Sequence, residues 1–169
     1  MKTPGLTLLV CVALGTSLAL AVPALAATSR ATNRCDSTTA ARVVVEANAY
    51  RASLGLSQLT VAPKLQRFAK AHAIDMAQSN VLTHSSSNGL SFSERAHASS
   101  YRFFTMRENV AVEGAPFPSE LGSDLMQLWR ASPPHDTNMR ARDISQIGVA
   151  VAAGRDGCYA SMELASPSA

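Results

Sequence analysis

Two histidines and one glutamate have side chains that can bind a metal ion or move a proton: His84, Glu108 and His135. Each lies beside turn-forming residues or at the expected end of a strand or helix. Two neutral imidazoles and a carboxylate can hold Zn²⁺ or another divalent ion and leave positions open for water. Because the three residues lie far apart in the sequence, only the tertiary fold can bring them together.

The chemistry open to these residues ranges from catalysis to a purely structural role. A metal-bound water activated by Glu108 could hydrolyse an ester or a peptide bond, but a glutamate that binds the metal is not free to act as the base. The chain has neither a helical H-E-x-x-H pattern nor a G-x-S-x-G turn that would make Ser85, next to His84, a nucleophile. We therefore expect binding more than catalysis, with a hydrogen-bonded structural network as the alternative.

Hydrophobic periodicity and turn signals predict the elements that must position these side chains. Helices are expected over residues 37–53, from 63 through 76, over 91–99 and over 119–129, with Pro133 and Pro134 ending the last one. Strands are expected over residues 101–112, 144–152 and 158–164. This order predicts an α+β domain in which helices cover an antiparallel sheet.

Several further side chains are assigned by their place in these elements. His72 lies on the apolar face of the second helix and is predicted to be a packed core residue, as is Trp129. Arg95 is predicted to lie at the surface or to pair with a helix cap. Three aromatic residues around the first strand are expected in the core or, alternatively, in the wall of an apolar groove: Tyr101, Phe103 and Phe104.

The N-terminal residues have the pattern of a secretory signal: one lysine, an apolar run, a proline and then Ala24-Leu25-Ala26. The apolar run is short for a membrane-spanning helix, so an uncleaved anchor is the less favoured alternative. We expect residues 1–26 to be a signal peptide, 27–37 a flexible lead-in and 38–169 the folded domain. The mature protein is then secreted or extracytoplasmic and has no stable membrane anchor.

Two of the three cysteines remain after removal of the predicted signal peptide, namely Cys35 and Cys158. In an exported chain such a pair predicts one disulfide bond, from near the mature N-terminus to a strand near the C-terminus. Two free thiols are the alternative.

The charge distribution argues against two classes of partner, nucleic acids and charged membrane surfaces. The formal net charge is only +3, and the sequence contains no run of like charges. A nucleic-acid partner would need clustered basic residues on one surface, and electrostatic docking to a membrane would need the same. We expect neither.

Short segments along the chain resemble, in order and spacing, the motifs of one known family. They are Asn48-Ala49-Tyr50-Arg51 with Gly55-Leu56, the helix from Leu65 through Met76, His84-Ser85, Gly89 to Arg95, Glu108-Asn109-Val110-Ala111, Trp129 with Ser132-Pro133-Pro134-His135, and Ile147-Gly148-Val149-Ala150. Together they resemble the CAP superfamily of cysteine-rich secretory proteins, antigen 5 and plant pathogenesis-related group 1 proteins. The resemblance covers about residues 42–164.

The resemblance implies an α-β-α sandwich with a central cleft lined by two histidines and up to two glutamates. Carried over residue by residue, these are His84, His135 and Glu108, which would also be the metal ligands. The second family glutamate corresponds to Ser132, so the full set of four is not present.

Two further departures from the family pattern lie next to the second histidine. Pro134 replaces the usual glycine, and Asp136 replaces the usual arginine. A carboxylate close to His135 would favour the protonated imidazole, so we expect a raised pKa there if the two side chains approach.

The resemblance implies sterol and lipid binding in some eukaryotic members of the family. We expect this chain to bind a small apolar ligand, a cell-envelope component or a protein partner in or near the cleft formed by His84, Glu108, His135 and Ser132. Zn²⁺ or another divalent metal is the expected cofactor, if there is one. The alternatives are a divalent-metal-dependent extracellular hydrolase with Glu108 as the catalytic residue, and a secreted interaction or defence module without a small ligand.

Overall fold

The computed structural model describes residues 35–114 and 120–168. The predicted signal peptide, almost all of the predicted lead-in and the loop around Pro116 and Pro118 lie outside the described residues. Within the described part, no helix combines the length and the apolar character needed to cross a membrane.

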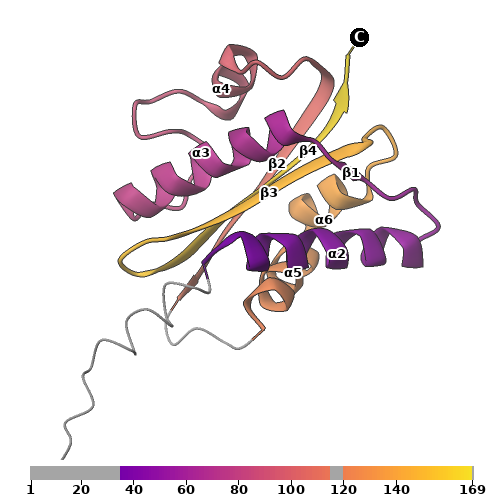
Figure 1. Cartoon of the computed structure of the whole chain (residues 1–169), viewed down its shortest axis with the longest axis horizontal. Coiled ribbons are helices and arrows are strands. Elements are labelled where there is room, and N and C mark those ends of the chain that lie inside the picture. The colour runs from indigo at the N-terminus through magenta and orange to yellow at the C-terminus, as the bar shows by residue number, and fades with distance from the viewer. Residues whose placement is uncertain (1–34, 115–119, 169) are drawn as a thin grey trace, which may run out of the picture.

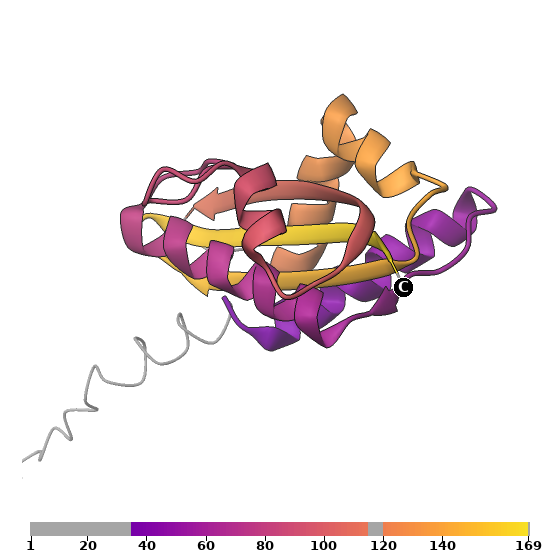
Figure 2. The same cartoon turned by 90° about the horizontal axis from the view of Figure 1, so that it is seen from above.

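Helices cover both faces of a four-stranded sheet (Figures 1 and 2). The elements are α2 (Ser37–Ser53), β1 (Thr60–Val61), α3 (Pro63–Ser79), α4 (Phe92–Ala98), β2 (Phe103–Gly114), α5 (Leu121–Ala131), α6 (Pro133–Arg140), β3 (Gln146–Ala153) and β4 (Gly157–Pro167). Helices α2, α5 and α6 lie on one face, and α3 with α4 beside it lies on the other. The predicted α-β-α sandwich is therefore confirmed.

The strand order is β1-β3-β4-β2. Strands β2, β4 and β3 form the antiparallel sheet that the sequence predicts, with Glu108 of β2 opposite Glu163 of β4. The two residues of β1 add a short parallel strand beside β3, which the prediction of a purely antiparallel sheet missed.

Local chemistry explains where α2 and α3 begin. Asp36 caps α2, because its carboxylate accepts hydrogen bonds from the backbone N–H groups of Thr38 and Thr39 at 2.9 and 3.1 Å. Pro63 opens α3 as predicted, at a position where the missing N–H has no cost.

The helix that contains Trp129 does end before Pro133 and Pro134, as predicted, but the sequence analysis missed the short helix that these prolines begin. Helix α5 ends at Ala131, and the two prolines occupy the first turn of a new helix, α6. Proline is tolerated there because first-turn N–H groups have no partner within the helix. The chain changes direction at Ser132, and this places His135 in the first turn of α6.

The core predictions are largely confirmed. Trp129 is fully buried and its indole Nε1–H donates to the carbonyl of Val110 at 3.1 Å, while His72 is 2% exposed. Phe104 differs, because a register shift in β2 at this point leaves its side chain 79% exposed.

Close contact between α3 and the sheet depends on a glycine in β3. A Cβ atom on Gly148 would lie 2.5 Å from the backbone carbonyl carbon of Leu65, so any larger residue would push the helix outward. This close packing brings the residues at the end of α3 near the sheet edge formed by β2.

The predicted disulfide bond is confirmed. Cys35, just before α2, is bonded to Cys158 at the start of β4, across a sequence separation of 123 residues. The bond ties the beginning of the described chain to β4, an inner strand of the sheet.

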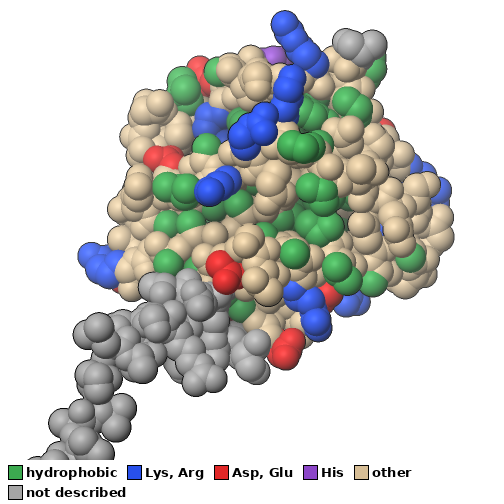
Figure 3. All heavy atoms as spheres, in the orientation of Figure 1, with side chains coloured by type: hydrophobic (Ala, Val, Ile, Leu, Met, Phe, Trp, Pro, Cys, Tyr) green, Lys and Arg blue, Asp and Glu red, His purple; other side chains and the backbone are tan. Residues whose placement is uncertain are grey.

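On the face shown in Figure 3, apolar side chains lie across the middle with basic and acidic side chains around them, and no single sign of charge covers that face.

Candidate functional site

The three side chains singled out in the sequence converge at the β2 edge of the sheet. His84 lies on the loop between α3 and α4, Glu108 lies in β2 and His135 lies in the first turn of α6. The two imidazole centroids are 6.4 Å apart, with the rings tilted at 53°. The fold thus pairs the two histidines beside Glu108, and this group of three residues is called the histidine cleft after the cleft that the family resemblance implies.

Glu108 is the buried centre of this cleft. Its Oε1 accepts a hydrogen bond from His84 Nδ1 at 2.8 Å, and its Oε2 accepts one from Arg95 Nη2 at 2.7 Å. Burial alone would raise the pKa of Glu108, but the hydrogen bonds from His84 and Arg95 and the charge of Arg95 outweigh it and lower the pKa. Glu108 is therefore a carboxylate whose two oxygens are both engaged.

The charge of Glu108 determines the tautomer of His84. An ionised carboxylate can only accept hydrogen bonds, so Nδ1 of His84 carries the proton. The other ring nitrogen, Nε2, then keeps its lone pair when the ring is neutral. The His84 side chain is 54% exposed, so it is open to solvent and to a ligand.

Arg95 was predicted to lie at the surface or to pair with a helix cap, and the structure places it instead against Glu108 and the His84 loop. Its side chain is only 10% exposed, and Nη2 donates to the carbonyl of His84 at 2.8 Å as well as to Glu108. The guanidinium lies over the rings of Phe68 and Phe92, at 5.2 and 5.7 Å from their centroids. Arg95 therefore holds the His84 loop, Glu108 and α4 together.

His72 supports the same loop from α3. Its Nε2 lies 2.8 Å from the carbonyl oxygen of Thr83 and 3.7 Å from Oε2 of Glu108. Burial lowers the pKa of His72 and outweighs the opposing effect of Glu108, so the ring is neutral and Nε2–H donates to Thr83. The predicted core histidine is thus also a support for His84.

Two asparagines that the sequence analysis did not single out as site residues hold His135 in place. Asn109 Nδ2 donates to the carbonyl of His135 at 3.0 Å, and Asn138 Nδ2 donates to Asn109 Oδ1 at 2.9 Å. Asn138 Nδ2 also lies 3.2 Å from the carbonyl of Glu108. The sequence offered one signal for their role: Asn109 directly follows Glu108, and Asn138 comes three residues after His135.

The expected rise in the pKa of His135 depended on a close approach of Asp136, whose carboxylate is instead directed to other partners. Asp136 accepts a hydrogen bond from the hydroxyl of Tyr50 at 2.6 Å and pairs with Arg140 at 3.3 Å. Burial and then the proximity of His84 lower the pKa of His135. Ser132 lies at the junction of α5 and α6, where its side chain makes no capping hydrogen bond.

Glu163 is a second buried carboxyl group that the sequence analysis did not assign to the site. It lies opposite Glu108 in the sheet, is completely buried, and accepts a hydrogen bond from Ser161 Oγ at 2.8 Å. Its Oε2 has no hydrogen-bond partner among the described residues. Burial and the charge of Glu108 raise the pKa of Glu163 well above its ordinary value. The sequence signal for this buried carboxyl group was a glutamate within an otherwise largely apolar strand.

The predicted three-ligand metal set stays a prediction. Within residues 35–114 and 120–168, no cluster of three or more His, Cys, Asp or Glu side chains has an arrangement that could hold a metal ion. Both oxygens of Glu108 already accept hydrogen bonds, from His84 and from Arg95.

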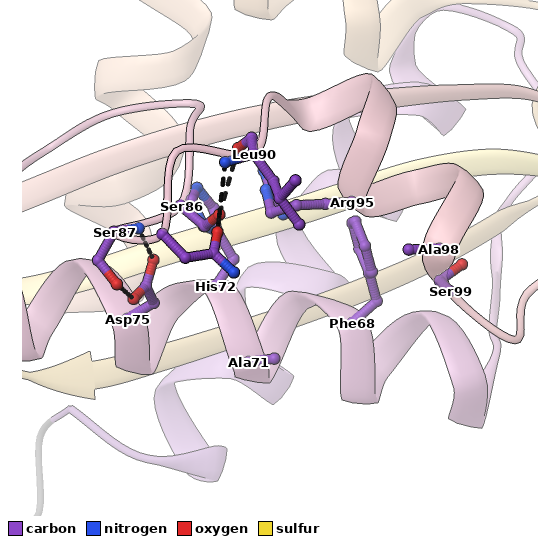
Figure 4. A pocket seen from close by; sticks show the side chains of 11 residues that line it. Phe68, Ala71, His72, Asp75, Ser86, Ser87, Leu90, Arg95, Ala98 and Ser99 are labelled. Carbon is purple, nitrogen blue, oxygen red and sulfur yellow. Dashed lines mark hydrogen bonds between the residues drawn. The ribbon is translucent and has the colours of Figure 1, made fainter.

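A cavity of about 370 Å³ adjoins this network on the side of α3 and α4 (Figure 4). It is lined by residues from α3, from the serine-rich loop and from α4: Phe68, Ala71, His72, Asp75, Ser86, Ser87, Asn88, Leu90, Arg95, Ala98 and Ser99. Arg95 and His72 belong both to the cavity wall and to the network around Glu108, so the cavity and the histidine cleft share a wall.

The α-β-α sandwich is the fold of SCP-domain proteins. The chain belongs to the cysteine-rich secretory protein family, because the family model, CAP, matches residues 45–164. Among curated proteins, no match was found.

Solved structures with the same fold include bacterial surface and extracellular proteins. An outer surface protein of Borrelia burgdorferi has a TM-score of 0.68 at 20% identity, with 78% of this chain and 95% of that chain covered. An extracellular SCP-domain protein of Bacillus anthracis has a TM-score of 0.67 at 18% identity over 80% of this chain. The matched region is only 42% of that longer protein.

The structure of NaASP2 with Zn²⁺ is a more distant relative in fold. Its TM-score is 0.56 at 13% identity, with 78% of this chain and 82% of that chain covered. These likenesses establish the fold, and the ligands of this chain are a separate question.

Proposed function

We propose that this domain is an extracytoplasmic binding protein that takes a small, largely apolar ligand in the cavity beside the histidine cleft. The observation that carries this proposal is the cavity of about 370 Å³ between α3, the serine-rich loop and α4. The printed descriptions of the Bacillus anthracis and Borrelia burgdorferi proteins, extracellular and outer surface, support the location outside the cytoplasm.

The chemistry of the cavity wall favours an apolar ligand. Phe68 and Ala71 of α3 face Leu90 and Ala98 from the other side, and the polar groups lie between and around them. Small-molecule sites typically have volumes of roughly 300–1,000 Å³, mostly apolar walls and a few polar groups, and this cavity fits that description.

The cleft itself favours binding over hydrolysis. A general base needs a free oxygen within reach of a water or substrate proton. Both oxygens of Glu108 accept hydrogen bonds and its side chain is 1% exposed, so the predicted catalytic role of Glu108 receives no support from the geometry.

A cavity-filling substitution tests the proposed binding. Ala98 is exposed toward the cavity at the end of α4, so Ala98→Leu should occupy the ligand volume without disturbing the fold. We expect the neutral fluorescent dye N-phenyl-1-naphthylamine to bind the mature protein and Ala98→Leu to weaken binding by roughly tenfold or more.

The matched control is Ala41→Leu, which makes the same change at an exposed position of α2 on the opposite face of the sheet. It should leave dye affinity unchanged. The proposal fails if the dye does not bind, or if both variants reduce binding equally.

A second candidate function is divalent-cation binding at the paired histidines. The hydrogen bond between His84 Nδ1 and Glu108 supports it, because metal-binding histidines usually donate their other ring N–H to a carboxylate. His84 and His135 would hold the ion, which would supply Lewis-acid chemistry or simply bridge the loop to α6. Two protein ligands predict weaker binding than a closed four-ligand site.

Calorimetric titration with Zn²⁺ tests this candidate. We expect His84→Ala and His135→Ala each to reduce affinity by roughly tenfold or more, because each removes one of two protein ligands. His97→Ala, at an exposed histidine of α4, is the matched control and should have no effect. Affinity should fall at acidic pH, because an imidazole binds a metal ion only when it is neutral. Zn²⁺ uptake that survives both substitutions would exclude this site.

A further inference from the structure

We infer that the cavity takes a neutral apolar ligand that carries a hydroxyl group. This inference rests on the proposed function and names the class of ligand. It follows from two buried side-chain nitrogens in residues of the cavity wall, each without a hydrogen-bond partner among the described residues.

The first of these nitrogens is a donor, Nε of Arg95. The Nη2 of this residue donates to Glu108 and to the carbonyl of His84, whereas Nε is buried without a partner among the described residues. The Arg95 side chain is only 10% exposed and lines the cavity. A guanidinium nitrogen can only donate a hydrogen bond, so the missing partner is an acceptor.

The second nitrogen is an acceptor, Nδ1 of His72. Nε2 of the same ring lies 2.8 Å from the carbonyl oxygen of Thr83, and because a carbonyl only accepts, Nε2 carries the ring proton. Nδ1 of the neutral ring therefore has a lone pair, and it is buried without a partner in the described part of the chain. His72 is 2% exposed and lines the same cavity, so its missing partner is a donor.

Arg95 and His72 are neighbours beside Glu108. Nη2 of Arg95 lies 2.7 Å from Oε2 of Glu108, and Nε2 of His72 lies 3.7 Å from the same oxygen. A hydroxyl group donates one hydrogen bond and accepts others, so it can supply both kinds of missing partner. Because a buried polar group without a partner is unfavourable, a ligand that brings these partners is favoured over one of the same shape that does not.

Other polar side chains of the wall already have partners. Asp75 accepts hydrogen bonds from the backbone N–H and the hydroxyl of Ser87, a pairing visible in Figure 4. Ser86 donates to Asn88, and Ser99 donates to a backbone carbonyl of α4. The unmet hydrogen bonds thus lie at Arg95 and His72, which favours an apolar molecule with one polar end.

Three naphthalenes that differ in one substituent test the inference. The hydroxyl of 2-naphthol donates and accepts, the carboxylate of 2-naphthoate only accepts, and 2-methylnaphthalene does neither. Each is titrated against the mature protein with bound N-phenyl-1-naphthylamine, and the loss of dye fluorescence gives its affinity. We expect 2-naphthol to bind at least about tenfold more tightly than either of the other two, because a site that hydrogen-bonds a hydroxyl rejects analogues without one.

The outcomes separate this inference from the proposed function. If the dye shows no binding that Ala98→Leu weakens, the proposed function fails and this inference fails with it. If the dye binds the cavity and 2-naphthol has no advantage over 2-methylnaphthalene, this inference alone is overturned. Binding of 2-naphthoate as tight as that of 2-naphthol also overturns it, because a carboxylate has no hydrogen for Nδ1 of His72.

His72→Gln tests the acceptor. The glutamine amide N–H can still donate to the carbonyl of Thr83, but the variant lacks the lone pair of Nδ1. We expect the advantage of 2-naphthol over 2-methylnaphthalene to shrink by roughly fivefold, as for the loss of one hydrogen bond. His97→Gln is the matched control at an exposed histidine of α4 that does not line the cavity, and it should keep the full advantage.

Arg95→Lys tests the donor and provides a second route in case His72→Gln does not fold. Lysine keeps a cation for Glu108 but has no counterpart of the Nε–H group, so the advantage of 2-naphthol should shrink in the same direction. Arg67→Lys, at an exposed position of α3 outside the cavity wall, should leave it unchanged. A full advantage in every folded variant of His72 and Arg95 would overturn the inference.

Discussion

Glu108 and Glu163 lie opposite one another on neighbouring strands, yet their pKa values shift in opposite directions. Glu108 is bound to Arg95 and His84, which stabilise its charge, whereas Glu163 is completely buried with a hydroxyl donor from Ser161. Two adjacent buried carboxylates would repel each other strongly. Glu163 therefore holds its proton more tightly than Glu108 does.

The raised pKa of Glu163 makes stability depend on pH. Its pKa in the folded protein is raised by burial and by Glu108, so the native state keeps a proton that the unfolded state releases above about pH 4.3. Its contribution to stability is thus complete below that pH and is lost as pH rises toward the folded pKa. We expect Glu163→Gln, which mimics the neutral acid, to be increasingly more stable than wild type as pH rises.

Urea unfolding at several pH values measures this effect. Ser161→Ala is a suitable control, because it removes a hydrogen bond and retains the carboxyl group, so the pH dependence should persist. Parallel stability curves for wild type and Glu163→Gln would show that Glu163 is already ionised in the folded protein.

At the scale of the elements, the cleft depends on how α6 is attached. Its first turn carries His135, and Asn109 of β2 binds the carbonyl of that residue. Its last turn is held by Arg51 of α2, a buried side chain whose Nη1 donates to the carbonyls of Met139 and Ala141, each at 2.8 Å. Both ends of α6 are thus held by polar side chains from other elements.

Loss of the Arg51 anchor should be costly. Arg51→Ala leaves the carbonyls of Ser57, Met139 and Ala141 without their donor in a region where Arg51 is 2% exposed. We expect the free energy of unfolding to fall by about 3 kcal/mol, measured by chemical denaturation. Arg42→Ala on the exposed face of α2 should lower it far less, because exposed ion pairs contribute little to stability. Equal effects of the two substitutions would contradict the anchoring role.

At the scale of the whole molecule, side chains from elements on both faces of the sheet lie next to each other at the edge strand β2. His84 reaches it from the α3 side, and His135 reaches it from the α6 side. Trp129 and Asn138 donate to carbonyls of β2, so side chains from α5 and α6 cover part of this edge. The paired histidines therefore come from elements on opposite faces of the sheet and lie close together at its edge.

The same arrangement links the cavity to the cleft. Arg95 lines the cavity and also binds both Glu108 and the backbone of His84. A ligand that moved Arg95 would therefore disturb the partner that orients the His84 ring. The cavity and the histidine cleft are therefore coupled through Arg95.

Much of the fold could be predicted because its signals are local. The helical periodicity of α3, Pro63 at its first turn and the alternating β4 strand each reflect a few neighbouring residues. Helix α6 was missed because proline is compatible both with the end of one helix and with the first turn of the next. Only packing against β2 decides between these outcomes.

The sequence by itself determined the fold class, the family motifs and the disulfide pair, because spacing and residue type carry that information. That His84, Glu108 and His135 would converge was implied only by the family resemblance. The tertiary structure alone decided that Arg95 is buried against Glu108, that Glu163 lies opposite Glu108, and that a cavity lies behind the cleft. These features depend on strand register and on the packing of α4 over α3. Both are set by contacts between residues distant in sequence, which no local pattern records.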